Sequence, residues 1–143
     1  MYFDDFKLGE TFDIEPCVID KGDMVAFAKK YDSIPLHTDE DYAEKTHFGK
    51  LIAPGVMSFM SVWAKYLEID LAGEELLGGK STKIEWMRPV FAGDVLTGKG
   101  RVSALTPRNE KNGIVELTFE VTNQDGVLVL TDVTEMIVKR KRN

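Results

Sequence analysis

An aspartate and a histidine stand five positions apart at Asp32 and His37, with a proline between them. The chain holds only two histidines, and His37 is the first of them. A carboxylate and an imidazole can together move protons on and off a water molecule near neutral pH. An aspartate before a turn more commonly caps a helix, and a lone histidine more commonly has a structural role. From these residues alone, acid–base catalysis and a structural role both stay open.

The residues around this pair predict a helix before it and a shorter one after it. Asp20 is the candidate N-cap of the first helix, which the apolar pattern extends to about Tyr31. Pro35 disfavours helical geometry at the residue before it, so this helix should end before the proline. Thr38 is the expected cap of the second helix. The acid–base pair is therefore predicted at a break between two helices.

A longer helix is expected at Gly55–Leu67, after an irregular segment at residues 44–54. Apolar residues lie on nearly every face of this stretch, which is typical of a helix buried in the centre of a domain. The stretch is too short and too interrupted to span a bilayer. On its own, Gly55 after Pro54 indicates no more than the start of a helix.

The period of the apolar residues changes from helical to strand-like after Gly78-Gly79. The candidate strands are Ser81–Arg88, Val95–Leu105, Gly113–Asn123 and Val127–Lys139. Residues 123–126 (Asn-Gln-Asp-Gly) are typical of a hairpin turn. Consecutive antiparallel strands after one apolar helix favour an α+β fold, in which a curved antiparallel sheet wraps around the central helix.

Composition and charge exclude several classes of protein. The length of 143 residues fits a single domain, 1–143, and the formal net charge of −6 argues against nucleic-acid binding, which needs a basic face. Cys17 is the only cysteine, which suits a reducing compartment and excludes a disulfide within the chain. The N-terminal residues are acidic and no apolar signal region follows them, so we expect a cytoplasmic protein with no membrane partner.

A metal site is not expected. His47 follows His37 by ten residues in the irregular segment, and no third ligand stands nearby. We expect His47 at the surface or at a pocket rim. Asp94 follows a glycine before a strand, where turn chemistry explains it. Arg88 and Lys83 could meet the phosphates of coenzyme A, although cations on strand faces are usually solvated.

Three landmarks occur in a fixed order along the chain: Tyr31-Asp32 with Pro35-Leu36-His37, then Leu51–Val56, and then Arg88–Asp94. Together they resemble the MaoC-like dehydratase family, the hot-dog-fold (R)-specific enoyl-CoA hydratases. The similarity runs from about Phe6 to Val138. The chain departs from the family's hydratase motif at two positions, where Tyr31 stands in place of a glycine and Ile34 in place of an asparagine.

The resemblance implies a hot-dog fold and reversible addition of water across the 2,3 double bond of an acyl-CoA or carrier-bound acyl thioester. It implies that Asp32 and His37 jointly hold the water, and that the Gly55 N–H stabilises the oxyanion. Pro54 is expected to line the acyl pocket, and Met57, Phe59 and Trp63 of the central helix are expected to line it or to belong to the core. No cofactor is implied, because coenzyme A is part of the substrate. The resemblance also implies a homodimer, or a higher oligomer of dimers.

Two further functions stay open at this point. Hot-dog proteins also include acyl-CoA thioesterases, although the Pro-Leu-His motif argues against that reaction. A non-catalytic acyl-binding accessory subunit is the other alternative, and the isoleucine at position 34 is its main support.

Overall fold

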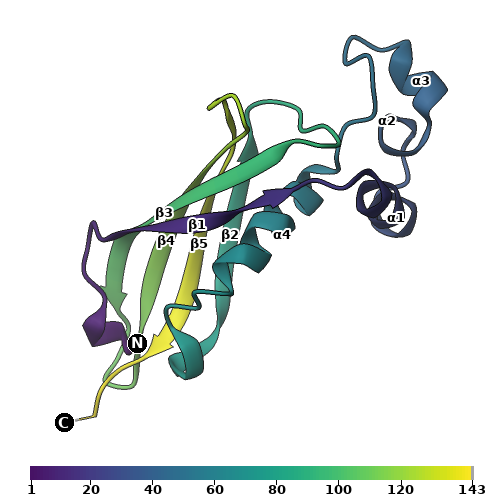
Figure 1. The fold of residues 1–143 in the computed structure, drawn as a ribbon. Helices are drawn as coiled ribbons and strands as arrows, with labels where there is room; N and C mark the ends of the chain where they lie inside the picture. Colours follow the sequence, from purple (N-terminus) through teal and green to yellow (C-terminus); the bar gives the residue numbers. More distant parts are fainter. Residues whose placement is uncertain (143) are drawn as a thin grey trace.

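Five antiparallel strands form one sheet in this computed structural model, which describes residues 1–142 (Figure 1). The strands are β1 (Thr11–Val18), β2 (Leu76–Trp86), β3 (Val95–Pro107), β4 (Asn112–Thr122) and β5 (Leu128–Lys139). Their order in the sheet is β1-β3-β4-β5-β2, so β1 and β2 form its two edges. The predicted antiparallel sheet is confirmed.

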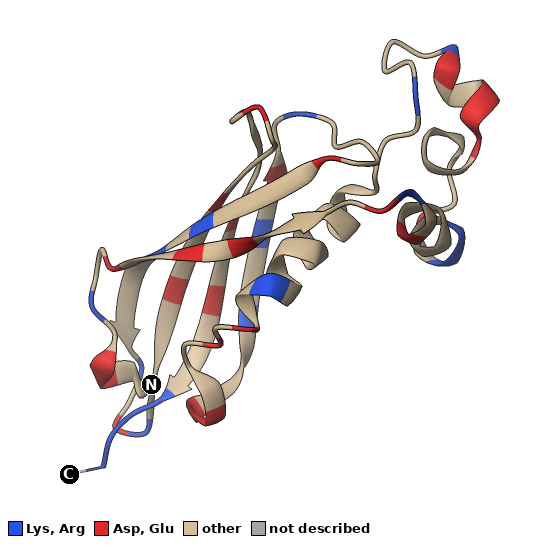
Figure 2. Cartoon of the chain, viewed as in Figure 1, with Lys and Arg blue, Asp and Glu red and all other residues tan. Residues whose placement is uncertain are grey.

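Four α-helices accompany the sheet. They are α1 (Lys21–Tyr31), α2 (Pro35–Thr38), α3 (Glu40–Glu44) and α4 (Gly55–Tyr66), with short 3-10 turns at Phe3–Asp5 and Gly73–Glu75. Helix α4 lies along the sheet, whereas α1, α2 and α3 gather beyond one end of it (Figure 1). We call the segment from α1 to α3, residues 21–44, the helical extension. Its acidic side chains are concentrated on α3 (Figure 2).

Helix α1 begins and ends where the sequence predicts. The backbone N–H of Asp23 donates to the Asp20 carboxylate at 2.9 Å, which confirms Asp20 as the N-cap. The helix ends at Tyr31, ahead of Pro35. Aspartate at this position satisfies one of the N–H groups that the first helical turn leaves without an acceptor.

The predicted cap of the next helix is wrong by one residue. Asp39 caps α3, because its carboxylate accepts from the N–H of Tyr42 at 3.1 Å. Thr38 instead ends α2, and its hydroxyl donates to the carbonyl of Ile34 at 3.1 Å. The difference arises because Pro35 starts a short helix of its own, since a fixed φ and a missing N–H suit the first helical position.

Strand β2 begins five residues earlier than predicted. Gly78 and Gly79 lie inside it, where its pairing with β5 shifts in register. Glycines weaken a regular strand but are tolerated at a bulge, particularly in an edge strand. The hairpin turn between β4 and β5 is confirmed, with the N–H of Asn123 donating to the carbonyl of Val127 at 3.0 Å and Gly126 at a φ of +74°.

The core lies between α4 and the sheet. Val62 and Tyr66 of α4 are buried against it, and Phe119 of β4 packs edge-on to Tyr66 with ring centroids 5.4 Å apart. Gly98 of β3 allows the close approach, because a Cβ there would lie 3.0 Å from a methyl carbon of Val62. The helix is not buried on all sides as predicted, since Met60 on its other face is 47% exposed.

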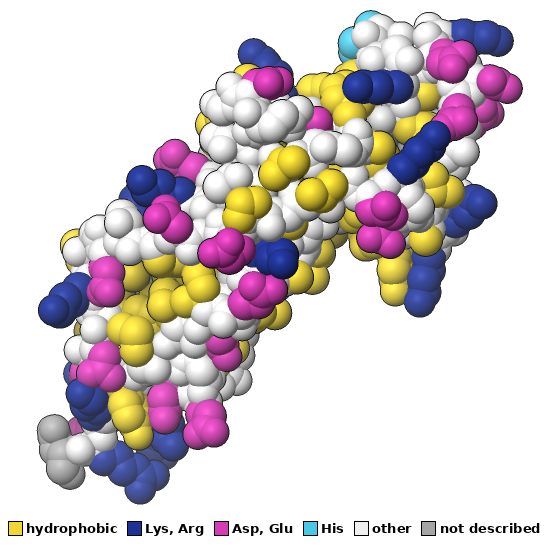
Figure 3. Space-filling model, viewed as in Figure 1, with side chains coloured by type: hydrophobic (Ala, Val, Ile, Leu, Met, Phe, Trp, Pro, Cys, Tyr) yellow, Lys and Arg dark blue, Asp and Glu magenta, His cyan; other side chains and the backbone are white. Residues whose placement is uncertain are grey.

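Positive and negative side chains are interspersed over the face of the molecule shown in Figure 3, with apolar side chains between them. Within residues 1–142, no helix is long and apolar enough to cross a membrane.

Candidate active site

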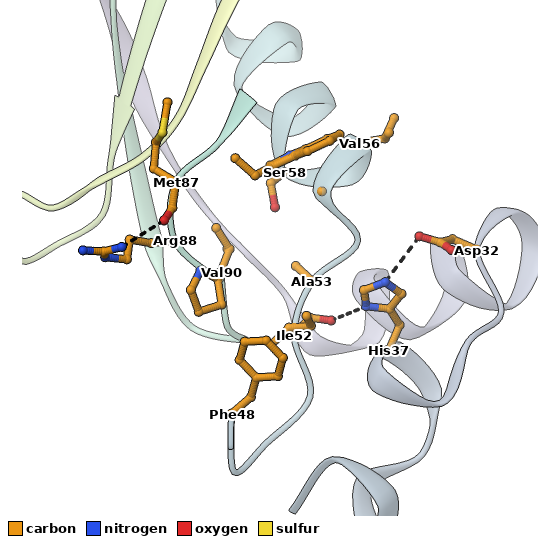
Figure 4. Close-up of a pocket in the computed structure, with 13 residues that line it drawn as sticks. Asp32, His37, Phe48, Ile52, Ala53, Val56, Ser58, Met87, Arg88 and Val90 are labelled. Carbon is orange, nitrogen blue, oxygen red and sulfur yellow. Dashed lines mark hydrogen bonds and ion pairs between the residues drawn. The ribbon is translucent and has the colours of Figure 1, made fainter. Parts of the chain in front are cut away.

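A cavity of about 450 Å³ lies where the helical extension, the start of α4 and the end of β2 come together. Asp32 and His37 line it from the extension, Gly55 and Ser58 from the first turn of α4, and Trp86 from the end of β2. Figure 4 shows Asp32 and His37 on the side of the cavity opposite Ser58. Small-molecule pockets commonly measure about 300 to 1,000 Å³. The cavity is therefore large enough to hold the reacting part of a small ligand.

His37 and Asp32 face each other at the edge of this cavity. The Nε2 atom of His37 lies 3.3 Å from Oδ2 of Asp32. The His37 side chain is only 7% exposed, whereas that of Asp32 is 44% exposed. The predicted pair is thus brought together, with the imidazole in the wall of the cavity and the carboxylate in contact with solvent.

A second contact of His37 determines which ring nitrogen is available for chemistry. Its Nδ1 lies 2.7 Å from the carbonyl oxygen of Ile52, which can only accept, so Nδ1 carries a proton. In the neutral ring Nε2 is then an acceptor, and it faces another acceptor in the Asp32 carboxylate. A proton on Nε2, or one water that donates to both groups, satisfies this arrangement. The pair is therefore suited to bind a water and exchange a proton with it.

Backbone hydrogen bonds hold the turn that carries the pair. The N–H of Asp32 donates to the carbonyl of Ala28 at 2.8 Å, and the N–H of Ile34 donates to the carbonyl of Asp32 at 2.9 Å. The N–H of His37 then donates to the carbonyl of Ile34 at 3.0 Å. Ile34 is the N-cap residue of α2, and its side chain makes no capping bond. The turn thus brings Asp32 close to His37 although the residue at position 34 is apolar.

Gly55 is the first residue of α4, so its N–H has no acceptor within the helix. The N-terminus of a helix is also the positive end of its dipole. A Cβ on this residue would lie 2.4 Å from Cε2 of Trp86, because the indole packs directly against the glycine. A side chain at position 55 would therefore displace the tryptophan ring and reshape the cavity.

Four residues predicted for the pocket lie outside the lining of this cavity: Pro54, Met57, Phe59 and Trp63. Met57 and Phe59 are each 8% exposed and belong to the core, which was the alternative role for them. Trp63 packs against Tyr66 with ring centroids 4.9 Å apart. The face of α4 that meets this cavity carries Gly55 and Ser58 instead, so a place for those four residues in the acyl pocket stays a prediction.

Three residues with no predicted role also line the cavity: Ser58, Phe48 and Trp86. Ser58 could have been found, because it follows Gly55 by three residues and so shares its face of the helix. Phe48 lies in an irregular segment, and no sequence pattern places it. Arg88, considered as a phosphate contact, also lines the cavity, whereas Lys83 pairs with Glu85 at 3.3 Å.

The remaining sequence candidates have local roles. The ring of His47 lies against that of Phe48, with centroids 4.0 Å apart, which puts it beside the cavity lining. Asp94 accepts from the N–H of Phe91 at 2.9 Å and from the side-chain amide of Gln124 at 3.0 Å, which confirms a turn role. Across the part of the chain that the structure describes, no three His, Cys, Asp or Glu side chains gather in a way that could hold a metal ion.

The fold of the chain and the residues that line this cavity are those of a dehydratase-type hot-dog protein. Comparison with known proteins gives the same class. The family described as FAS1-like, dehydratase domain region, matches residues 7–132. The chain therefore belongs to this family, and the predicted relationship to MaoC-like dehydratases is confirmed.

Individual relatives bear out the assignment. An (R)-specific enoyl-CoA hydratase of Rhodospirillum rubrum is 31% identical over 110 residues, which are 76% of this chain and 74% of the relative. The structure of a monoamine oxidase regulatory protein from Archaeoglobus fulgidus is 31% identical, with a TM-score of 0.93 over 99% of this chain and 96% of that one. The MaoC-like dehydratase from Rhodospirillum rubrum is 26% identical, with a TM-score of 0.85 over 100% and 99%. The family is one of hydratases and dehydratases.

Proposed function

We propose that this protein adds water to, or removes it from, the 2,3 position of an acyl thioester. The observation that carries the proposal is the pair of His37 Nε2 and Asp32 Oδ2, 3.3 Å apart, in the same cavity as Gly55, the first residue of α4. Hydration needs a group that polarises water and a group that delivers a proton to C2. Positioned acid–base groups of this kind contribute about 10² to 10⁴-fold to a rate.

The reaction follows from this arrangement. The pair takes one proton from the bound water as its oxygen bonds to C3, and the electrons of the double bond move toward the thioester oxygen. C2 then receives a proton from the pair, so the product gains one hydroxyl and one hydrogen. The same steps in reverse remove water from a 3-hydroxyacyl thioester.

Negative charge collects on the thioester oxygen while C3 is attacked. The Gly55 N–H is a preorganised donor for that charge, because it has no intrahelical acceptor and lies at the positive end of the α4 dipole. The indole of Trp86 packs against this glycine and leaves no space for a side chain at position 55.

The substrate is an acyl-CoA or a carrier-bound acyl thioester, and no other cofactor takes part. Two relatives carry the names (R)-specific enoyl-CoA hydratase and 3-hydroxybutyryl-CoA dehydratase, each 31% identical to this chain. Arg88 lines the cavity, and among the described residues its guanidinium makes one hydrogen bond, to the carbonyl of Met87 at 3.2 Å. Its guanidinium can therefore meet an anionic part of such a substrate.

The test is to follow the loss of enoyl absorbance with crotonyl-CoA and longer 2-enoyl-CoAs. We expect turnover that falls by at least about 10²-fold in Asp32→Asn and in His37→Gln. His47→Gln is the matched control, because this second histidine lies outside the cavity lining, and it should keep wild-type rates. Folded wild-type protein without turnover on any chain length would contradict the proposal. Thiol release in the same assay would indicate a thioesterase instead.

We also propose that the protein works as a homodimer. The outer edge of β2 has no partner strand in the sheet, and such an edge is prone to pair with another chain. Exposed apolar residues lie on β2, on α4 and at the C-cap of α4: Val56, Met60, Leu67, Leu76, Leu77 and Trp86. Because Val56 and Trp86 also line the cavity, a second copy on this surface would cover one of its sides.

Light scattering at micromolar concentration tests this assembly. We expect twice the chain mass for the wild type and a shift toward the monomer for Met60→Lys. Leu8→Lys is the control, because Leu8 is 69% exposed and lies in the turn before β1. A monomeric wild type would contradict the proposal.

A further inference from the structure

Ser58 is a buried polar residue in the wall of the cavity. Its side chain is fully buried, with 0% exposure, yet it lines the cavity together with Gly55 and His37. Figure 4 shows the hydroxyl of Ser58 pointing away from α4, toward the space beside Val90 and Ala53. This hydroxyl therefore faces the place where a ligand would lie.

The hydroxyl has no good hydrogen-bond partner within the described residues. Its one hydrogen bond there is a long one to the carbonyl of Pro54, at 3.5 Å, and this carbonyl already accepts from the N–H of Ser58 at 3.1 Å. One turn later, Ser61 makes the equivalent bond to the carbonyl of Met57 at 2.9 Å. Buried hydroxyls are normally satisfied, so the weak bond of Ser58 indicates a donor that is free for a ligand.

Ser58 follows Gly55 by three residues, so the two lie on the same face of α4. The acid–base pair approaches from the helical extension, on the other side of the cavity. We propose that the Ser58 hydroxyl donates a hydrogen bond to the thioester oxygen of the substrate, beside the N–H of Gly55. This inference rests on the proposed hydratase function.

The hydroxyl keeps its proton throughout the reaction. As the water oxygen bonds to C3 and the double-bond electrons move to the thioester oxygen, the donors at Ser58 and Gly55 both strengthen their bonds to that oxygen. Both bonds weaken again when C2 is protonated. A donor that acts on the developing charge lowers the barrier more than it improves binding, so its loss should fall on kcat rather than on KM.

The kinetic test compares Ser58→Ala with Ser61→Ala. Removal of one oxyanion donor costs about 10² to 10³-fold in kcat in other enzymes, and we expect about 10 to 10³-fold for Ser58→Ala, with KM changed less than about threefold. Ser61→Ala removes a well-bonded hydroxyl of the same helix outside the cavity lining, and should keep wild-type kcat. Equal kcat values for wild type and Ser58→Ala, with unchanged unfolding temperature, would overturn the inference.

A spectroscopic test needs only binding. In an Asp32→Asn background, the infrared carbonyl stretch of bound ¹³C-labelled crotonyl-CoA should lie below that of the free thioester, because hydrogen bonds polarise the carbonyl. Adding Ser58→Ala should move the band back toward the free value, and adding Ser61→Ala should not. A band that Ser58→Ala leaves in place overturns the inference even if hydration is observed.

The same experiment separates the two proposals. If the wild type binds enoyl-CoA without turning it over, the hydratase proposal fails, while the band shift still shows whether Ser58 contacts the thioester oxygen. A protein that neither binds nor turns over these thioesters overturns both.

Discussion

The indole of Trp86 lies so close to Gly55 that a Cβ on residue 55 would be 2.4 Å from the ring atom Cε2. This contact joins the end of an edge strand to the first residue of α4. It also places a half-exposed aromatic ring beside the N–H that we propose for the oxyanion. The shape of the cavity at this point therefore depends on the absence of a side chain at position 55.

Gly55→Ala should separate folding from activity. Because Trp86 is 51% exposed, its ring can move aside, and we expect a loss of about 1 to 3 kcal/mol in unfolding free energy, as for other overpacked sites. Activity should fall by at least about 10²-fold, as for a lost oxyanion donor, because the displaced ring and the new methyl group obstruct the thioester. Denaturant unfolding and initial rates measure the two effects. The double variant with Trp86→Ala should recover stability; if it does not, the indole is not the cause.

Asp32 and His37 should act as one unit. Each single variant, Asp32→Asn and His37→Gln, should lose about 10² to 10⁴-fold in kcat/KM, because an amide can contact the shared water but cannot exchange a proton with it. The kcat/KM of the double variant should be only slightly lower than that of the less active single variant, since the effects of substituting groups that act together are not additive. Initial rates of the four proteins complete the cycle. Strictly multiplicative losses would show that the two residues act independently.

Ile34→Asn should stabilise the fold. Residue 34 is the N-cap of α2 and its side chain makes no capping bond. Asparagine at an N-cap can accept from the N–H groups of the first turn, and such caps are worth about 0.5 to 2 kcal/mol. Thermal unfolding of wild type, Ile34→Asn and the control Ile34→Ala measures the gain. Because backbone bonds already hold the turn, the activity of Ile34→Asn should stay at or above that of the wild type. A variant that is less stable than Ile34→Ala would contradict the expected cap.

Asp132 should make the stability of the protein fall as the pH rises. It is fully buried in β5, opposite Ile84 of β2, and burial raises its pKa above the ordinary 3.8, although the hydroxyls of Thr134 and Thr82 oppose the shift. The folded state therefore keeps a proton that the unfolded chain releases. Stability from this group is present below pH 3.8 and is lost as the pH rises through the folded pKa.

Asp132→Asn removes that titration while keeping the shape of the side chain. We expect the variant to unfold at a higher temperature than the wild type at pH 7, and the difference to shrink toward pH 3.5. Glu135→Gln is a control with the opposite expected sign, because hydrogen bonding from Ser81 lowers the pKa of Glu135. Loss of the Glu135 carboxylate should therefore reduce stability at pH 7. Thermal scans across this range measure both. A constant difference between Asp132→Asn and the wild type would contradict the assignment.

The sequence by itself determined the local features that depend on neighbouring residues. The Asp20 cap, the end of α1 before Pro35 and the turn closed by Gly126 all follow from side-chain and backbone preferences within a few residues. The pairing of Asp32 with His37 follows as well, because one turn of backbone is enough to bring them together. The ordered landmarks along the chain were also sufficient to indicate the family.

Only the tertiary structure decided which residues surround that pair. The cavity joins the helical extension to the start of α4 and to the end of β2, and these segments are far apart in the chain. Helix α4 is apolar all round, so its sequence does not say which face meets the cavity, the core or solvent. Packing against the sheet placed Phe59 in the core and left Ser58 facing the cavity. The contact of Trp86 with Gly55 likewise depends on how an edge strand meets a helix, which no local pattern encodes.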